Sequence, residues 1–159
     1  MGVKRIDSMT LTTFGAIMSF ALEMVGYSVN IYKTVGEKAK DPLLKETLQS
    51  LLKEEEKNCS LMEQTRRENV TEMILEPIAG LIQEDYEIKV RLSNEADDPD
   101  LLKVVLFLEE KEIKFFNESS GKVPLPEVSR IFRKIAQKKE KNLTKLKSLA
   151  VGEFLKVSS

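Results

Sequence analysis

Four long stretches of this 159-residue chain place apolar residues every three or four positions, and this spacing restricts the fold more than any other feature. Residues at this spacing share one face of an α-helix. Two of the stretches begin at a proline, Pro42 and Pro99, and proline is favoured at the first position of a helix. Pro124 and Pro126 lead into the fourth stretch. Gly121 fits the end of the third stretch. The predicted helices span residues 11–40, 42–67, 99–119 and 125–149.

The links between these helices predict how they pair. Short links join the first helix to the second and the third to the fourth, whereas residues 68–98 form a long linker, with one short helical turn expected near Ile78 to Tyr86. Two helical hairpins joined by a crossover form a four-helix bundle. We therefore expect residues 1–159 to fold as a single all-α domain without a β-sheet of consequence. Ser8 is the candidate N-cap of the first helix.

The second half of the chain repeats the pattern of the first half. A shift of 84 residues places Pro42 on Pro126, Leu22 on Leu106 and the segment 56–58 on the identical segment 140–142. The apolar positions stay aligned without a gap under the same shift. We interpret the two predicted hairpins as copies of one unit.

The chain contains no histidine and only one cysteine, Cys59. The lack of histidine excludes the Ser-His-Asp and Cys-His nucleophiles and removes the usual ligand of transition metals. A single cysteine excludes an internal disulfide and a CxxC zinc knuckle, and it fits a reducing compartment, so we expect a cytoplasmic location.

The formal net charge of −1 provides no global basic field, so we expect no nucleic-acid partner. Basic clusters occur at residues 66–67, 130–133 and 138–141. Acidic residues interleave with them in the sequence, and we interpret the clusters as solvated helix faces.

The N-terminal region superficially resembles a signal peptide, because Lys4 and Arg5 precede an apolar stretch from Thr10 to Met24. Glu23 interrupts this stretch before it reaches the ~20 residues that a membrane span requires. We therefore predict a core helix here and no membrane association.

Three charged residues lie on the apolar stripes of the predicted helices. Glu55, Glu109 and Lys139 are each three or four residues from apolar neighbours, and Asn58 and Asn142 border the same stripes. Charged side chains are rarely buried unless they are paired, so we expect these three to meet in the core. The alternative is that both glutamates are solvated within acidic runs and that the lysine extends to the surface.

This arrangement resembles the rubrerythrin branch of the ferritin-like proteins, from about Thr10 to Leu149. The segments that carry the resemblance are Ala-Leu-Glu-Met at 21–24, Ile-Tyr at 31–32, Lys-Asp-Pro at 40–42, Leu-Leu-Lys-Glu-Glu-Glu-Lys at 51–57 and Glu-Lys-Glu-Ile-Lys-Phe-Phe at 110–116. The resemblance implies a ferritin-like four-helix bundle. It also implies a di-iron site built from one Glu on helices one and three and a Glu-x-x-His on helices two and four.

Few of these family positions keep a ligand in this chain. The resemblance maps the six positions onto Val25, Glu55, Asn58, Glu109, Lys139 and Asn142. Only the two glutamates could still bind iron as the family does. A register shifted by one residue would instead pair Glu56 with Cys59, but the repeat favours the alignment of Asn58 with Asn142.

The resemblance and the lost ligands together predict a non-catalytic binding or structural module without a cofactor. Lys139 would supply the positive charge that iron supplies in the family. An ammonium group at this position would also repel a metal ion. The alternative is a metal-binding oxidoreductase, similar to rubrerythrin peroxidases and oxidases, that holds iron through Glu55, Glu109 and Glu112. Neither hypothesis identifies a small-molecule ligand.

The N-terminal half of the first helix is apolar on more than one face. Leu11, Phe14, Ile17 and Phe20 exceed what one stripe can bury. We therefore expect a homodimer that covers the surplus apolar surface.

Overall fold

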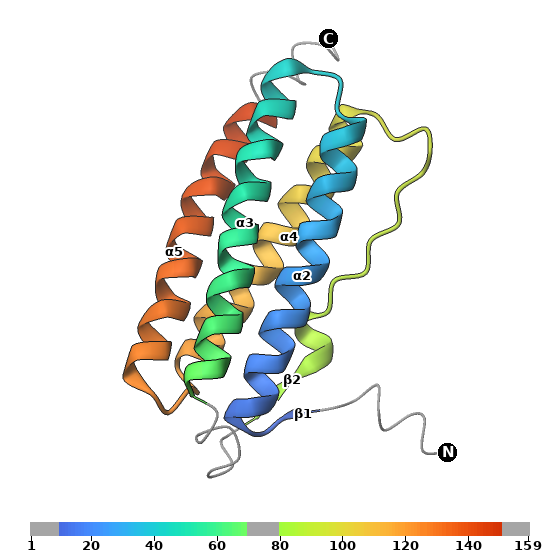
Figure 1. The fold of residues 1–159 in the computed structure, drawn as a ribbon. Helices are drawn as coiled ribbons and strands as arrows, with labels where there is room; N and C mark the ends of the chain where they lie inside the picture. The colour runs from blue at the N-terminus through green and yellow to red at the C-terminus, as the bar shows by residue number, and fades with distance from the viewer. Residues whose placement is uncertain (1–9, 70–79, 151–159) are drawn as a thin grey trace, which may run out of the picture.

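The computed structural model of the protein describes residues 10–69 and 80–150, and within them it is an all-α four-helix bundle (Figure 1). The helices are α2 (Phe14–Lys38), α3 (Pro42–Glu68), α4 (Asp98–Ser120) and α5 (Pro126–Leu149). Helix α2 packs along α3 and α4 packs along α5, so the predicted pair of hairpins with a long crossover between them is confirmed. The described part of the crossover includes one 3₁₀ turn, η2 (Gln83–Tyr86).

A short antiparallel pairing joins the start of the chain to the crossover. Strand β1 (Thr10–Leu11) pairs with β2 (Leu81–Ile82), and these two-residue strands are the only β-structure in the described ranges. Gly80 lies at this contact, where an added Cβ would clash with the Thr10 side chain. The pairing holds the start of the described crossover next to the N-terminal end of α2.

Side-chain caps explain where the helices begin. The Thr13 hydroxyl accepts a hydrogen bond from the Ala16 amide at 3.0 Å, so α2 begins three residues later than predicted. The predicted cap Ser8 lies outside the described residues. Asp41 accepts from the Leu44 amide at 2.9 Å ahead of α3. Asp97 and Asp100 form a reciprocal capping box at the start of α4.

Contacts from the crossover fix it along α2 and α4. The Val90 amide donates to the Tyr27 hydroxyl of α2 at 3.2 Å, and the Lys111 ammonium of α4 donates to the Asp85 carbonyl at 2.9 Å. The predicted turn at 78–86 is observed only as η2, and residues 78–79 lie outside the described ranges. The crossover occupies the edge of the bundle opposite α5 (Figure 1).

The apolar core consists of two clusters, one at each half of the bundle. The larger cluster centres on Phe115, whose ring lies 5.2–5.4 Å from the rings of Phe20, Tyr86 and Phe116. The smaller cluster is largely aliphatic and includes Leu48, Leu101 and Leu146, among others. Buried polar side chains separate the two clusters.

The argument for a dimer interface on the first helix is wrong. Leu11, Phe14, Ile17 and Phe20 are at most 8% exposed, because the crossover and the other helices cover them within one chain. The homodimer therefore remains a prediction without this support. Among the described residues, α2 is the one helix long and apolar enough to cross a membrane, and its apolar face packs into the bundle.

Candidate functional site

A layer of polar side chains crosses the middle of the bundle, and every helix contributes to it. We call this group the polar layer. Its members are Ser28 and Tyr32 of α2, Glu55 and Asn58 of α3, Glu109 and Glu112 of α4, and Lys139 of α5. All except Asn58 are at most 1% exposed. The layer lies between the two apolar clusters, so its charges have little access to water.

Lys139 is the centre of the polar layer. Its ammonium donates hydrogen bonds to Glu55 Oε1 at 2.8 Å and to Glu109 Oε2 at 3.1 Å. Glu112 Oε1 lies 2.9 Å from the same nitrogen, but its direction does not fit a hydrogen bond, so this contact is an ion pair only. The predicted meeting of Glu55, Glu109 and Lys139 is confirmed, and the alternative that the lysine extends to the surface is wrong.

Hydroxyl and amide groups complete the network around the carboxylates. The Tyr32 hydroxyl donates to Glu109 Oε2, and the Ser28 hydroxyl donates to Glu112 Oε2. The Asn58 amide donates to Glu55 Oε1 at 3.1 Å. Helix α2, which contributes no charge, is thus tied to both carboxylates of α4.

Two of the predicted site residues take no part in this network. Val25 is fully buried in the larger apolar cluster and offers no ligand atom. Asn142 donates to Glu54 at 2.5 Å, at the edge of the bundle, and not to the carboxylates at its centre. Asn58 and Asn142 differ because Asn142 of α5 is turned toward Glu54, a partly exposed residue of α3, whereas Asn58 points to the buried Glu55.

The alternative register on the second helix is also wrong. Glu56 is exposed to solvent, whereas Glu55 is 1% exposed. Cys59 is half-buried against the larger apolar cluster. Burial raises the pKa of its thiol, and the nearby carboxylates of Glu63 and Glu55 raise the pKa further, so the thiol is a poor nucleophile.

The contacts in the layer agree with the internal repeat. Ser28 contacts Glu112, and Glu55 contacts Lys139, and the members of each pair are separated by the 84 residues of the sequence shift. The polar layer is therefore where equivalent residues of the two predicted copies meet.

The charges of the layer do not balance when every carboxyl group is ionised. Burial alone would lower the pKa of Lys139, but the three carboxylates together raise it well above its ordinary value, so the lysine stays charged. One ammonium then faces three carboxyl groups. The two unmatched negative charges are expensive to bury, and each proton that a carboxyl group takes up removes one of them.

Glu112 is the group that holds a proton most firmly. Burial raises its pKa well above the ordinary range, and the charge on Glu55 raises it further. Burial would also raise the pKa of Glu55, but the Lys139 charge and the hydrogen bonds from Lys139 and Asn58 lower it overall. A proton held by Glu112 beside an ionised Glu55 accounts for both directions. For Glu109, burial raises the pKa despite the attraction of Lys139.

The residues present do not fit a di-iron centre. Three buried carboxyl oxygens, Glu55 Oε2, Glu109 Oε1 and Glu112 Oε1, have no hydrogen-bond partner, and carboxylates are suitable iron ligands. The ammonium of Lys139, however, contacts one oxygen of each carboxyl group. No group of three acidic, Cys or His side chains in the described ranges is arranged to hold a metal ion.

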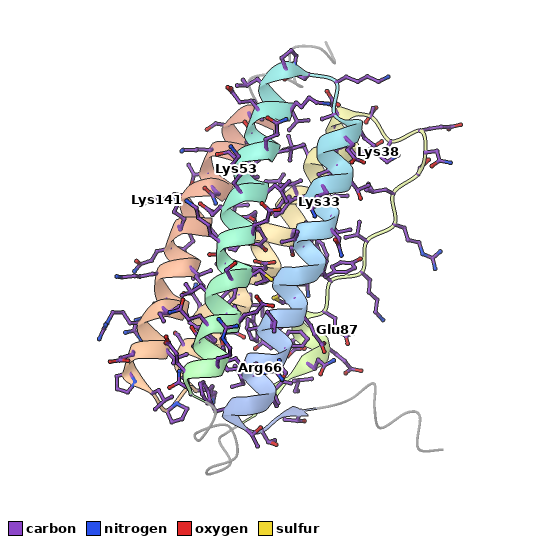
Figure 2. All side chains as sticks on the ribbon, viewed as in Figure 1. Lys33, Lys38, Lys53, Arg66, Glu87 and Lys141 are labelled. Carbon is purple, nitrogen blue, oxygen red and sulfur yellow. The ribbon has the colours of Figure 1, made fainter. Side chains whose placement is uncertain are left out.

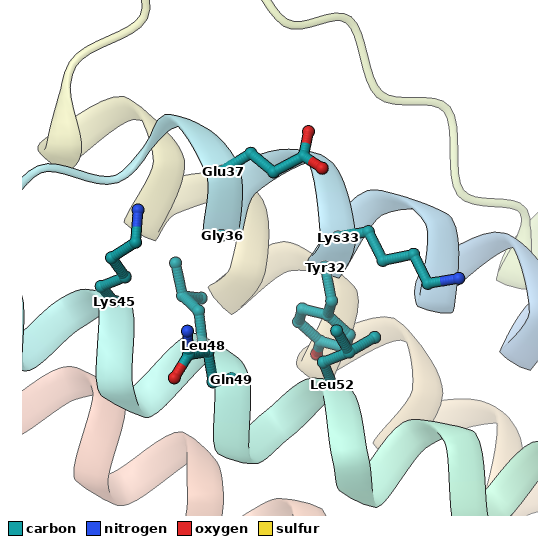
Figure 3. A pocket seen from close by; sticks show the side chains of 8 residues that line it. All are labelled: Tyr32, Lys33, Gly36, Glu37, Lys45, Leu48, Gln49 and Leu52. Carbon is teal, nitrogen blue, oxygen red and sulfur yellow. The ribbon is translucent and has the colours of Figure 1, made fainter.

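A groove between α2 and α3 approaches the layer from outside (Figure 3). It has a volume of about 240 Å³, and the side chains of Tyr32, Leu48 and Leu52 line it. The Tyr32 hydroxyl is the one that donates to Glu109, so this ring separates the groove from the polar layer. The pKa of Tyr32 is raised well above its ordinary value, first by burial and then by Glu109, which keeps the phenol protonated.

Sequence reasoning missed Ser28 and Tyr32 and gave Glu112 only a conditional role as a metal ligand. Ser28 and Tyr32 follow Val25 at three- and four-residue steps, and Glu112 follows Glu109 by three, so helical spacing was a usable signal for all of them. The repeat was a second signal, because Ser28 and Glu112 are equivalent under the shift.

The fold and the site define a class of protein: a two-hairpin, four-helix bundle with a buried lysine–carboxylate layer at its centre. No family model, curated protein or solved structure matches the chain.

Proposed function

We propose that the protein is a ferritin-like bundle related to rubrerythrin, in which Lys139 has replaced the metal and which acts as a non-catalytic binding or structural module. One observation supports this proposal above all others. The Lys139 ammonium lies within 3.1 Å of three carboxyl groups, at the place where the resemblance expects a metal.

The chemistry of the layer supports a structural role. An ammonium ion neutralises carboxylates as a metal ion does, but it carries no redox chemistry and provides no open coordination position. Its acid–base chemistry is also confined, because Lys139 is 1% exposed and its pKa is raised by its partners. The layer joins side chains of all four helices, and buried ion pairs of this kind are candidates for fixing how helices pack.

Iron titration of the purified protein tests the proposal, with Lys139→Glu as the matched variant. The unaltered protein, purified without chelator and titrated with Fe²⁺ under anaerobic conditions, should bind far less than one ion per chain. Lys139→Glu exchanges the central cation for a carboxylate and should gain iron binding. Stoichiometric, tight binding to the unaltered protein would overturn the proposal.

The metal-binding oxidoreductase remains the second candidate, and a specific observation favours it. Three buried carboxyl oxygens without hydrogen-bond partners are unusual in a folded core. Under this hypothesis Glu55, Glu109 and Glu112 bind iron in the unaltered protein. Stoichiometric iron that is lost in Glu109→Gln, together with peroxide turnover, would decide for it.

A further inference from the structure

The small net charge of the chain conceals two strongly charged regions. Helix α5 contains eight Lys or Arg residues and two acidic residues, a formal charge of +6. Residues 81–120, which comprise the described crossover and α4, contain five basic and eleven acidic residues, a formal charge of −6. The crossover and α5 lie at opposite edges of the bundle (Figure 1). The molecule is therefore electrically asymmetric.

The outer face of α5 carries a continuous row of cations, which we call the basic row. It consists of Arg130, Lys134, Lys141 and Lys145, which are all exposed. At 3.6 residues per turn these side chains lie within about 60° of one another and extend over about 22 Å along the helix. Figure 2 shows Lys141 on the side of α5 that faces away from the bundle.

The acidic residues that interleave with this row in the sequence do not lie on it. Glu140 faces α4, where it accepts a hydrogen bond from Asn117 at 3.5 Å. On the other flank, Lys138 pairs with Glu54 of α3 at 3.5 Å. These two contacts mark the edges of the exposed face, and no acidic residue lies on that face from Arg130 to Lys145. The cations of this helix are exposed, as a solvated face requires, but the acid that interleaves with them, Glu140, lies on the flank of the row.

The crossover, which carries five acidic and two basic residues over 81–97, is too far away to cancel the field of the basic row. Two helix diameters, roughly 20 Å, separate α5 from the crossover. The Debye length is only about 8 Å at physiological ionic strength. A ligand at α5 therefore experiences the local positive charge and not the net charge of the chain.

We propose that the outer face of α5 is a docking surface for the phosphate backbone of a nucleic-acid duplex. A duplex presents about 13 phosphate charges along the 22 Å of the row, so each of the four cations can meet a phosphate without bending the duplex. An anionic membrane is a poorer fit, because the row has no apolar side chain to insert. The exposed large hydrophobic residues, Tyr27, Leu43, Ile82 and Phe107, all lie on other elements.

This surface would bind the duplex through the charge and spacing of its phosphates, without selecting a base sequence. The four cations are suited to phosphates, and Gln137 is the one neutral polar side chain between them on this face, so most contacts are of the kind that position a protein on the backbone. This inference differs from the expectation of no nucleic-acid partner that was drawn from net charge. It does not depend on the proposed function, because it concerns a different face of the molecule from the polar layer.

The salt dependence of duplex binding tests the inference. Fluorescence anisotropy with a labelled, arbitrary duplex of about 20 base pairs gives the affinity between about 50 and about 200 mM NaCl. Four phosphate contacts predict a slope of log affinity against log salt of about −3.6, which is a weakening of roughly 150-fold over this range. Lys134→Gln with Lys141→Gln should reduce the slope to about −1.8 and the weakening to roughly 12-fold.

The matched control removes the same charge elsewhere. Lys33→Gln with Lys103→Gln changes two exposed lysines of α2 and α4, and it should leave the slope unchanged. Equal slopes in the two double variants, or no duplex binding by the unaltered protein at about 50 mM salt, would overturn the inference. So would tighter binding to phosphatidylserine vesicles than to the duplex, or self-association through the row at low salt, because each assigns the row to another partner.

Discussion

Replacing Lys139 with methionine tests the buried charge network directly. Methionine has a similar length and fills much of the same space, but it carries no charge. The change leaves Glu55, Glu109 and Glu112 buried without a cation, although all three are at most 1% exposed in the folded chain. The effect therefore comes from electrostatics and not from a cavity.

The contacts of Lys139 set the size of the expected effect. Its ammonium makes two hydrogen bonds to buried carboxyl groups, each worth about 1.5–3 kcal/mol because the partners are charged. The methionine side chain packs against its apolar neighbours, and this packing offsets part of the loss. Breaking a buried ion pair by removing one partner generally costs about 3–5 kcal/mol. We expect Lys139→Met to lower the free energy of unfolding by about 3–5 kcal/mol.

Urea unfolding followed by circular dichroism measures this change. In Lys139→Met with Glu55→Gln and Glu109→Gln, most of the lost stability should return, because two of the three carboxylates are gone and the raised pKa of Glu112 favours its protonated form. A cost below about 1 kcal/mol for the single variant would show that the lysine pairs contribute nothing. An equal cost for the single and triple variants would show that lost packing, and not charge, is responsible.

Three further predictions concern the proton of Glu112, a helical glycine and the N-terminal aromatic residues. Because its folded pKa is raised, Glu112 makes the stability of the unaltered protein fall as pH rises above the ordinary pKa of glutamate, by up to about 1.4 kcal/mol per pH unit. Glu112→Gln should reduce this slope in unfolding measured from pH 5 to 8 and leave the smaller contribution of Glu109. Gly36 lies inside α2 with open space where a Cβ would be, so Gly36→Ala should stabilise by up to about 1 kcal/mol, whereas Gly80→Ala should destabilise because of the contact with Thr10. Phe14→Ser with Phe20→Ser should unfold much of the protein, by at least about 3 kcal/mol, and not merely shift a dimer toward monomer, as sedimentation with circular dichroism would show.

The helices were predictable because their signals are local. Caps and prolines define the ends, so the predicted starts at 42, 99 and 125 differ from the structure by no more than one residue. The first helix was predicted to begin at residue 11, because apolar periodicity continues through Leu11 into the β1–β2 pairing. That pairing joins residues about 70 positions apart, and nothing in either two-residue segment indicates the other.

The site was predictable only where a charge interrupts an apolar stripe. Glu55 and Lys139 interrupt clear stripes, and both are at the centre of the layer. Glu112 is within a run of mixed charges that looks like a solvated helix face, and a serine such as Ser28 is unremarkable on any face. The partner of Asn142 depends on how α5 is rotated against α3, which spacing alone does not determine.

The polar layer fixes how the helices align along their axes, and replacing it should separate stability from specificity. A shift of α5 by one turn, about 5.4 Å, would move Lys139 into an apolar cluster and leave its carboxyl partners without a cation. An apolar layer has no such restriction. It requires Leu at positions 55, 109 and 112 and Met at 139, together with Ser28→Ala and Tyr32→Phe, so that no buried hydroxyl loses its acceptor. We expect this variant to retain or exceed the original stability, because hydrophobic replacements of buried ion pairs are often neutral or stabilising by about 1–4 kcal/mol. Its amide NMR spectrum should nevertheless broaden or show duplicate signals, since several helix alignments become similar in energy. A single sharp set of signals would show that the apolar clusters alone fix the alignment, and that the layer has been retained for another reason.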